Sequence, residues 1–201
     1  GDEPANPGGS EGGGGGEPQP EANVTSQVYK PGESGYAAFR IPAVVVSKAG
    51  TVLAFAEARK HSRSDTGDID LVLRRSTDGG RTWGDIITVW DDAGNVCGNP
   101  APVVDRETGR ILLLSTWNDG TDHEKDIHAR TAKDTRRVFV LYSDDDGLTW
   151  SSPREITPSV KREDWTWYAT GPCHAIQLQK GRHKGRIVVS CNHGLFKDGK
   201  G

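Results

Sequence analysis

Methionine is absent from this 201-residue sequence, and cysteine occurs only at Cys97, Cys173 and Cys191. The three cysteines lie far apart and lack the short paired spacings of a structural zinc site. Their odd number argues against a complete disulfide framework, so we expect free structural thiols. His123 and His128 have no third ligand at a metal-like spacing. We therefore expect no metal site and no cofactor.

Long apolar runs are also absent, although hydrophobic residues make up 33% of the sequence. No stretch approaches the length that a membrane-spanning helix needs, so we expect a soluble or tethered chain with no membrane span. The net charge is −3, and the first 22 residues hold five acidic and no basic side chains, which leaves +2 for the remainder. That weak charge excludes the basic stripe of a nucleic-acid-binding protein and is compatible with a small anionic ligand.

The N-terminal segment has the composition of a flexible linker. Gly12 to Gly16 form an unbroken run between prolines and acidic residues, and such a segment cannot form a core. We expect a Gly/Pro-rich acidic tail over residues 1–34 and a folded domain over residues 35–201. The segment resembles the tether of a secreted bacterial protein or lipoprotein after signal removal, with a cloning or gene-prediction boundary as the alternative. The expected location is secreted, periplasmic or at the bacterial cell surface, with any lipid tether upstream of the tail.

Short β-branched and aliphatic runs separated by Gly, Asp and Asn fill the sequence from Gly35 onward. No amphipathic helix of more than a few turns is expected, so the predicted fold class is all-β. The expected strands form two sets of four and the start of a third: 41–47, 51–57, 70–75 and 86–90; then 101–105, 110–116, 137–142 and 154–157; then 174–178 and 186–191.

Two matching turns define the repeat. Residues 76–83 (STDGGRTW) and 143–150 (SDDDGLTW) share the pattern S-x-D-x-G-x-T-W, each between the third and fourth strand of its set. Ser and Asp can bond loop amides, Gly permits the tight turn, and Trp can fill a hole between sheets. The pattern resembles the Asp box of sialidases and other propellers, and predicts about two and a half β-propeller blades. A calcium loop at 143–147 is disfavoured because the bidentate Glu and flanking helices of an EF-hand are absent.

Three further motifs carry a more specific resemblance. They are FRIP at 39–42, FAEAR at 55–59 and SDTGD at 64–68, with Asp65 six residues after Arg59. Together with GNPAPVVD at 98–105 and TGP at 170–172, this order resembles the bacterial exo-sialidase (neuraminidase) family from about Tyr36 to the last residue. The resemblance implies a six-bladed propeller and a glycoside hydrolase that removes terminal sialic acid from sialylated glycans or glycoconjugates with retention. This chain would form the N-terminal part of that propeller.

The resemblance also implies roles for individual residues. Arg40 matches the first arginine of a triad that binds the substrate carboxylate, a group that suits planar guanidinium partners. Arg59 matches the next family arginine, on the ring's hydroxyl side, and Asp65 matches the general acid/base. Asn99 is expected to open the first strand of the second blade and to contact the region of the ring's O4.

The residues also have alternative interpretations in which they do not take these roles. The alternative for Arg40 is a surface arginine that caps a strand, and Arg59 has a structural alternative as well. The alternative for Asn99 is a turn-forming residue before its proline. Asp68 and Asp70 are the nearby rivals to Asp65 for the acid/base role, although Asp68 could instead hold the Asp65 loop and Asp70 falls at the head of a strand. The aromatic cluster of Trp165, Trp167 and Tyr168 (residues 165–168), expected in a loop before the third blade, could line a pocket or pack the blade.

Part of the family's machinery has no match in these residues: two arginines of the triad, the tyrosine nucleophile and its glutamate. We therefore expect this chain alone to be inactive. The alternative function is a non-catalytic Asp-box propeller that binds glycans or another protein. A trans-sialidase would use the same residues, and the sequence does not separate it from a hydrolase.

Overall fold

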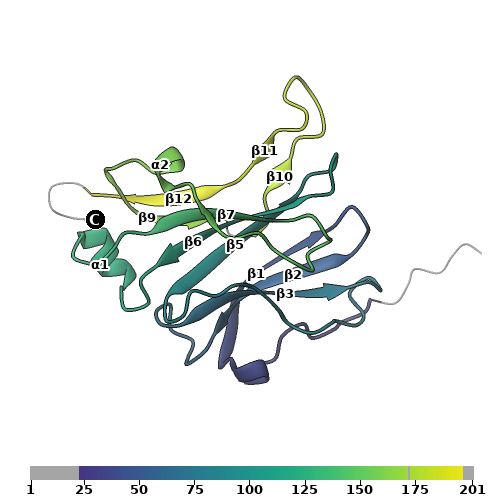
Figure 1. The fold of residues 1–201 in the computed structure, drawn as a ribbon, viewed down its shortest axis with the longest axis horizontal. Helices are drawn as coiled ribbons and strands as arrows, with labels where there is room; N and C mark the ends of the chain where they lie inside the picture. The colour runs from purple at the N-terminus through teal and green to yellow at the C-terminus, as the bar shows by residue number, and fades with distance from the viewer. Residues whose placement is uncertain (1–22, 172, 197–201) are drawn as a thin grey trace, which may run out of the picture.

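The computed structural model describes residues 23–171 and 173–196. The Gly/Pro-rich leader of residues 1–22 lies outside the described residues. The all-β prediction is confirmed, because twelve strands and only short helical turns make up the described chain (Figure 1). Among these residues, no helix has the length and apolar character needed to cross a membrane. The elements are η1 (Glu33–Gly35), β1 (Ala38–Val46), β2 (Val52–Arg59), β3 (Ile69–Ser76), β4 (Ile87–Trp90), β5 (Val96–Val104), β6 (Ile111–Asn118), α1 (Glu124–Ala129), β7 (Arg137–Ser143), β8 (Arg154–Glu155), α2 (Thr157–Val160), β9 (Trp165–Thr170), β10 (Ile176–Gln177), β11 (Ile187–Val188) and β12 (Cys191–Leu195).

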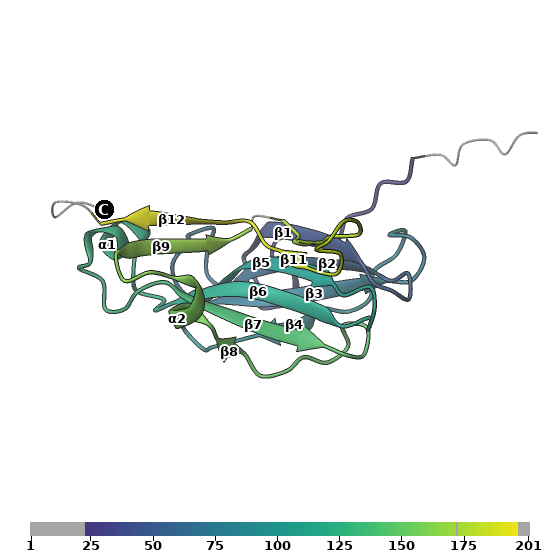
Figure 2. The same cartoon turned by 90° about the horizontal axis from the view of Figure 1, so that it is seen from above.

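The first eight strands form two blades of four antiparallel strands each, β1 to β4 and β5 to β8, as the repeat predicts. A single parallel pair, Ile69 with Val96, connects β3 to β5. In each complete blade the strands run in order across the molecule: β1 and β5 lie toward its upper side in Figure 2, with β9 and β12, and β4 and β8 lie toward its lower side. This arrangement is that of consecutive propeller blades, whose first strands surround the axis.

The first strands of the two complete blades carry the same irregularity. The strand register shifts within residues 40–43 of β1 and within residues 98–101 of β5. Each bulge contains a proline, which cannot donate to the ladder. The residue before it has a left-handed backbone, with φ of 54° at Ile41 and 51° at Asn99. The prediction that these strands begin at residues 41 and 101 was wrong, because each continues on both sides of its bulge.

The first strand of the third blade also begins earlier than predicted, because an irregular backbone again interrupts it. The expected set began at residue 174, whereas residues 165–170 form β9 and pair with β12, and β10 pairs with β11. The backbone between β9 and β10 is left-handed at Gly171 (φ 82°) and Cys173 (φ 67°). The aromatic segment that we expected in a loop is therefore the start of the third blade's first strand.

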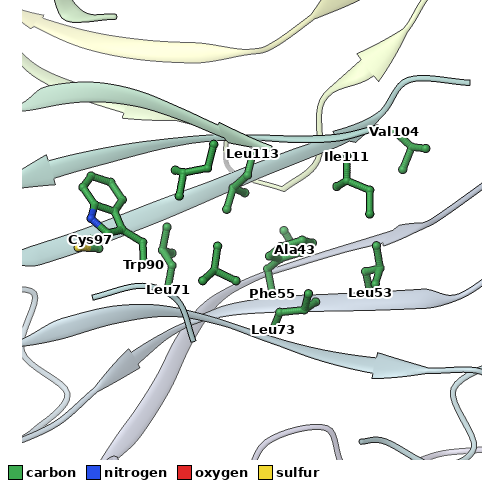
Figure 3. Packing of buried hydrophobic residues seen from close by; sticks show 12 residues of the cluster. Ala43, Leu53, Phe55, Leu71, Leu73, Trp90, Cys97, Val104, Ile111 and Leu113 are labelled. Carbon is green, nitrogen blue, oxygen red and sulfur yellow. The ribbon is translucent and has the colours of Figure 1, made fainter. Parts of the chain in front are cut away.

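The main core lies between the first and second blades (Figure 3). Aliphatic side chains of β2 and β3 pack toward those of β5 and β6, and the ring of Trp90 lies 4.8 Å from that of Phe139. Burial of apolar area between blades, rather than within one sheet, stabilises this fold. The buried members are Ala43, Leu53, Phe55, Leu71, Leu73, Val89, Trp90, Cys97, Val104, Ile111, Leu113 and Leu141.

Both Asp-box turns have the hydrogen bonds that their sequence predicts. In the second box, Ser143 Oγ accepts from the amide of Gly147 at 2.9 Å, and Asp145 Oδ1 accepts from the amide of Thr149 at 2.8 Å. The first box repeats this pattern with Ser76 and Asp78. Hydrogen bonds from the hydroxyl and amide of Thr149 lower the pKa of Asp145 to about 2.

The second Asp box also attaches the second blade to the first. Trp150 packs edge-on against Phe55 of β2, with ring centroids 5.7 Å apart, so its expected role between sheets is confirmed. Asp146 accepts from Thr51 Oγ1 at 2.6 Å and from Arg75 Nη2 at 2.7 Å, both in the first blade. The carboxylates of this loop are therefore held by protein donors, as a structural turn requires.

Part of the expected tail lies against the first blade. The ring of Tyr29 stacks on Phe39 at 4.8 Å, and its hydroxyl donates to the carbonyl of Ala54 at 2.6 Å. Arg74 donates to the carbonyl of Val28 at 2.7 Å. Further toward the N-terminus, Trp83 Nε1 donates to Ser26 Oγ at 3.0 Å. We expected the tail to extend to residue 34, and these contacts lead us to propose that the folded domain begins near Ser26.

Replacing Asp145 with Asn should lower the free energy of unfolding at neutral pH and weaken its acid dependence. The native pKa is depressed, so the ionised carboxylate stabilises the fold above the ordinary aspartate value of about 3.9, and this contribution is lost as the pH falls toward about 2. Urea unfolding at a series of pH values measures the effect. The matched control is Asp85→Asn, in the exposed β3–β4 loop. An unchanged acid limb in the Asp145 variant would contradict the assignment.

Candidate functional site

Three predicted site residues meet at one end of the first blade. Arg40 lies on β1, Arg59 is the last residue of β2, and Asp65 is in the loop that follows. One carboxylate oxygen of Asp65, Oδ1, accepts from Arg40 Nη1 at 2.9 Å and from Arg59 Nη1 at 2.7 Å. The spacing in the sequence thus becomes a compact group of two cations and one anion.

The two arginines differ in their exposure to solvent. The Arg59 side chain is only 4% exposed, whereas those of Arg40 and Asp65 are 45% and 72% exposed. Arg59 also donates to the carbonyl oxygens of Arg63 and Ser64, at 2.7 and 2.8 Å. Arg59 therefore fixes the loop from beneath, while Arg40 and Asp65 remain accessible to a ligand.

A buried glutamate supports this group. Glu57 Oε2 accepts from Arg59 Nη2 at 2.6 Å and from Nε at 3.2 Å, and both side chains are almost fully buried. Its other oxygen, Oε1, accepts from the backbone amide of Asn99 at 3.0 Å. The glutamate thus connects the first blade's arginine to the bulge of the second blade's first strand. A Cβ at Gly98 would lie 2.6 Å from Oε1, so only glycine leaves room for this contact.

We expected Asn99 to open the first strand of the second blade, but it lies in the middle of β5, at the bulge. The proline that follows it misled the prediction, because strand pairing resumes beyond it. The left-handed backbone of Asn99 is a turn-like geometry, as expected if this residue forms a turn before its proline. The carbonyl accepts from Thr170 Oγ1 at 2.7 Å, and the side-chain oxygen accepts from Thr116 Oγ1 at 2.9 Å and from Arg136.

Asp68, the rival acid, points to a different place. Its carboxylate lies 3.1 Å from Lys60 Nζ, and Asp70 and Asp91 lie 3.4 and 3.8 Å from the same amine. Burial alone would lower the pKa of Lys60, but its hydrogen bond to Asp68 and the two other carboxylates raise it above its ordinary value. The three carboxylates are grouped closely enough to hold a cation, and the lysine amine is the cation among them.

Two site residues had no assigned role in the sequence. Glu57 could have been noticed as one of two charged residues in a strand that is otherwise apolar and buried. Arg136 gives no such signal, because it precedes a strand and is followed by a second arginine. The aromatic segment of β9 belongs mainly to packing: Trp167 lies under Arg136 at 4.0 Å, and Trp165 stacks on His193 at 3.6 Å.

Comparisons with known proteins agree with this geometry. The sequence profile described as "BNR repeat-like domain" matches residues 50–199. The chain belongs to this family of repeat-built β-propellers.

Its relatives include an exo-alpha-sialidase of Aspergillus fumigatus, 37% identical over 73% of this chain and 40% of the relative. A sialidase of Bacteroides fragilis is 32% identical over 75% of this chain and 30% of its own length. Human sialidase-3 is 34% identical over 72% and 35%. The resemblance to sialidases is confirmed, and the chain spans 40% or less of the length of these three relatives.

Solved structures show the same relationship. A Hadza microbial sialidase, Hz136, superposes with a TM-score of 0.72 at 29% identity, over 81% of this chain and 34% of the other. A leech intramolecular trans-sialidase superposes with a TM-score of 0.74 at 16% identity, over 86% of this chain and 43% of the other, which supports the fold alone. The predicted partial propeller is confirmed.

Replacing Gly98 with Ala should destabilise the protein by about 1–3 kcal/mol, because the new methyl group would overlap Glu57 Oε1. Gly94→Ala is the matched control, since a Cβ there meets no atom within 4 Å. Denaturant unfolding of the two variants measures the difference. Equal stability of the two variants would show that Glu57 does not occupy the position described.

Proposed function

We propose that this chain forms the N-terminal part of the catalytic propeller of a retaining exo-α-sialidase, a glycoside hydrolase that acts on terminal sialic acid of glycoconjugates. The observation that carries the proposal is the meeting of Arg40, Arg59 and Asp65 around one carboxylate oxygen. A propeller scaffold has no need of this group, and the named relatives are sialidases. The chain spans only 40% and 30% of the length of these two relatives, so we assign the activity to a larger protein that contains this chain.

Arg40 is the proposed ligand of the substrate carboxylate. Its guanidinium is half exposed, and its present partner is the carboxylate of Asp65. A substrate carboxylate can take the same planar donors, since guanidinium binds any carboxylate in this way. Substrate and Asp65 would then compete for Arg40, and substrate binding would free Asp65 on that side.

Asp65 is the proposed general acid/base. It would protonate the glycosidic oxygen as that bond breaks, and would then remove a proton from the water that hydrolyses the intermediate. Its position at the exposed tip of the loop suits a group that must reach a leaving group. Arg59, held from beneath by Glu57, would set the position of Asp65. The tyrosine nucleophile, its glutamate and two arginines would come from other blades.

We also propose that the protein acts outside the cytoplasm, as a secreted, periplasmic or cell-surface enzyme. The acidic, Gly/Pro-rich leader supports this location, because it has the composition of an extended tether. The lipid tether expected upstream of the tail falls outside the described residues.

Replacing Asp65 with Asn, in a polypeptide that carries this chain within a complete propeller, should lower turnover of sialyllactose by about 10²–10⁴-fold. The loss should be much smaller for an aryl sialoside with an acidic phenol, since that leaving group departs without a proton. Release of free sialic acid from both substrates measures the effect. Equal losses of kcat/KM on the two substrates would contradict the acid role, because kcat/KM reports cleavage of the glycosidic bond and not hydrolysis of the intermediate.

Asp68→Asn is the control, because its carboxylate faces Lys60 and not the arginines. It should retain turnover within a few-fold. The isolated 201-residue chain should release no sialic acid. Sialoside binding without turnover by the complete protein would favour the glycan-binding alternative, and transfer of sialic acid to an added sugar acceptor would favour a trans-sialidase.

A further inference from the structure

Arg136 is a buried arginine whose partners are all neutral. It immediately precedes β7, is 3% exposed, and donates through Nη2 to Asn99 Oδ1, through Nη1 to Asn118 Oδ1 and through Nε to the carbonyl of Tyr168 at 3.1 Å. Its guanidinium lies 4.0 Å from the centroid of the Trp167 ring.

Burial of a charged guanidinium costs free energy unless protein groups replace the hydrogen bonds that it made with water. Within the described chain, no carboxylate lies within ion-pair distance of Arg136, although Glu57, Glu124 and Asp65 act on it from further away. Burial lowers its pKa to about 10, so the group still carries its charge at neutral pH. Three neutral acceptors and one aromatic face are what compensate its lost hydration.

The contact with Asn99 determines which way that amide faces. A guanidinium has only donors, so the Asn99 atom that meets it must be the oxygen. The same oxygen also accepts from Thr116 Oγ1 at 2.9 Å. The amide nitrogen, Nδ2, has no hydrogen-bond partner among the residues that the structure describes, and the side chain is partly exposed. Asn99 therefore presents two N–H donors and no acceptor to a ligand.

We propose that Arg136 is a positioning residue that holds Asn99 in this orientation, so that the site selects a ligand group with an acceptor oxygen at Asn99. The proposal rests on the sialidase function proposed above and adds a specificity rule to it. A guanidinium is needed because it reaches both asparagine oxygens and one carbonyl from a single plane. Trp167 fixes that plane by stacking beneath it.

A double-mutant cycle tests this rule in the complete propeller, with sialyllactose as the substrate. Arg136→Lys should lower kcat/KM about tenfold or more, mainly through KM, because one charge-assisted hydrogen bond to the amide is lost. Asn99→Ala should cause a comparable loss. If Arg136 acts through Asn99, adding Arg136→Lys to Asn99→Ala should cost little more. Losses that multiply would overturn the proposal.

The matched control is Arg137→Lys. Its side chain pairs with Asp134 at 2.8 Å and with Glu155 at 3.4 Å on the surface, so KM should not change. Trp167→Leu is a second variant that keeps the charge of Arg136 and removes only the stacking partner. It should raise KM in the same direction and by a smaller factor. An unchanged KM in both Arg136→Lys and Trp167→Leu would overturn the proposal.

A measurement without catalysis separates this proposal from the sialidase assignment. In the 201-residue chain, amide hydrogen exchange at Asn99 reports the bond from its N–H to Glu57. Arg136→Lys should speed exchange at Asn99 selectively, whereas Arg137→Lys should not. Unchanged protection at Asn99, or equal loss throughout both blades, overturns the positioning role. Absence of sialoside turnover in the complete wild-type protein would instead overturn the proposed function.

Discussion

The buried carboxylate of Glu57 is the contact on which the candidate site depends. One of its oxygens holds Arg59 and, through it, the loop that carries Asp65; the other holds the backbone of the second blade at Asn99. The side chains of Glu57 and Arg59 are both buried, so removal of the Arg59 charge would leave the Glu57 carboxylate without an ion-pair partner, at a cost of about 3–5 kcal/mol. The same group therefore couples blade packing to site geometry.

The two ends of the blades are organised differently. At one end, the Asp-box turns satisfy their own carboxylates within the loop, and Asp146 attaches the second blade to the first through Arg75. At the other end, carboxylates and guanidiniums remain partly exposed and converge from separate elements. Hydrogen bonds at the Asp-box end stabilise the blades, so the opposite end can hold charged groups that a ligand can reach. Loops at one end of a rigid scaffold commonly carry function for this reason.

The left-handed bulges are what turn strand residues into site residues. A regular strand would alternate side chains between its two faces and keep its amides in the ladder. The bulge at Asn99 releases the amide to Glu57 and leaves the side-chain oxygen in contact with Arg136 and Thr116. Gly98 is required beside it because the carboxylate approaches too closely for a Cβ. The irregular backbone therefore has a role in the site, whereas the sequence shows only a proline within a strand.

By itself, the sequence determined the all-β class, the fourfold strand repeat and both Asp boxes, because strand period and turn chemistry are local properties. That Arg40, Arg59 and Asp65 share one site followed from the resemblance of their motifs to the sialidase family. The sequence placed the starts of β1, β5 and β9 too late, since a proline inside a bulge looks like a strand boundary. Only the tertiary structure decided the partners of Glu57, the orientation of Asn99 and the position of Arg136. The contact of Glu57 with the Asn99 amide joins residues 42 positions apart, and that of Arg136 with the Asn99 side chain joins residues 37 positions apart. Burial gives a charged group its partners only after the blades have packed.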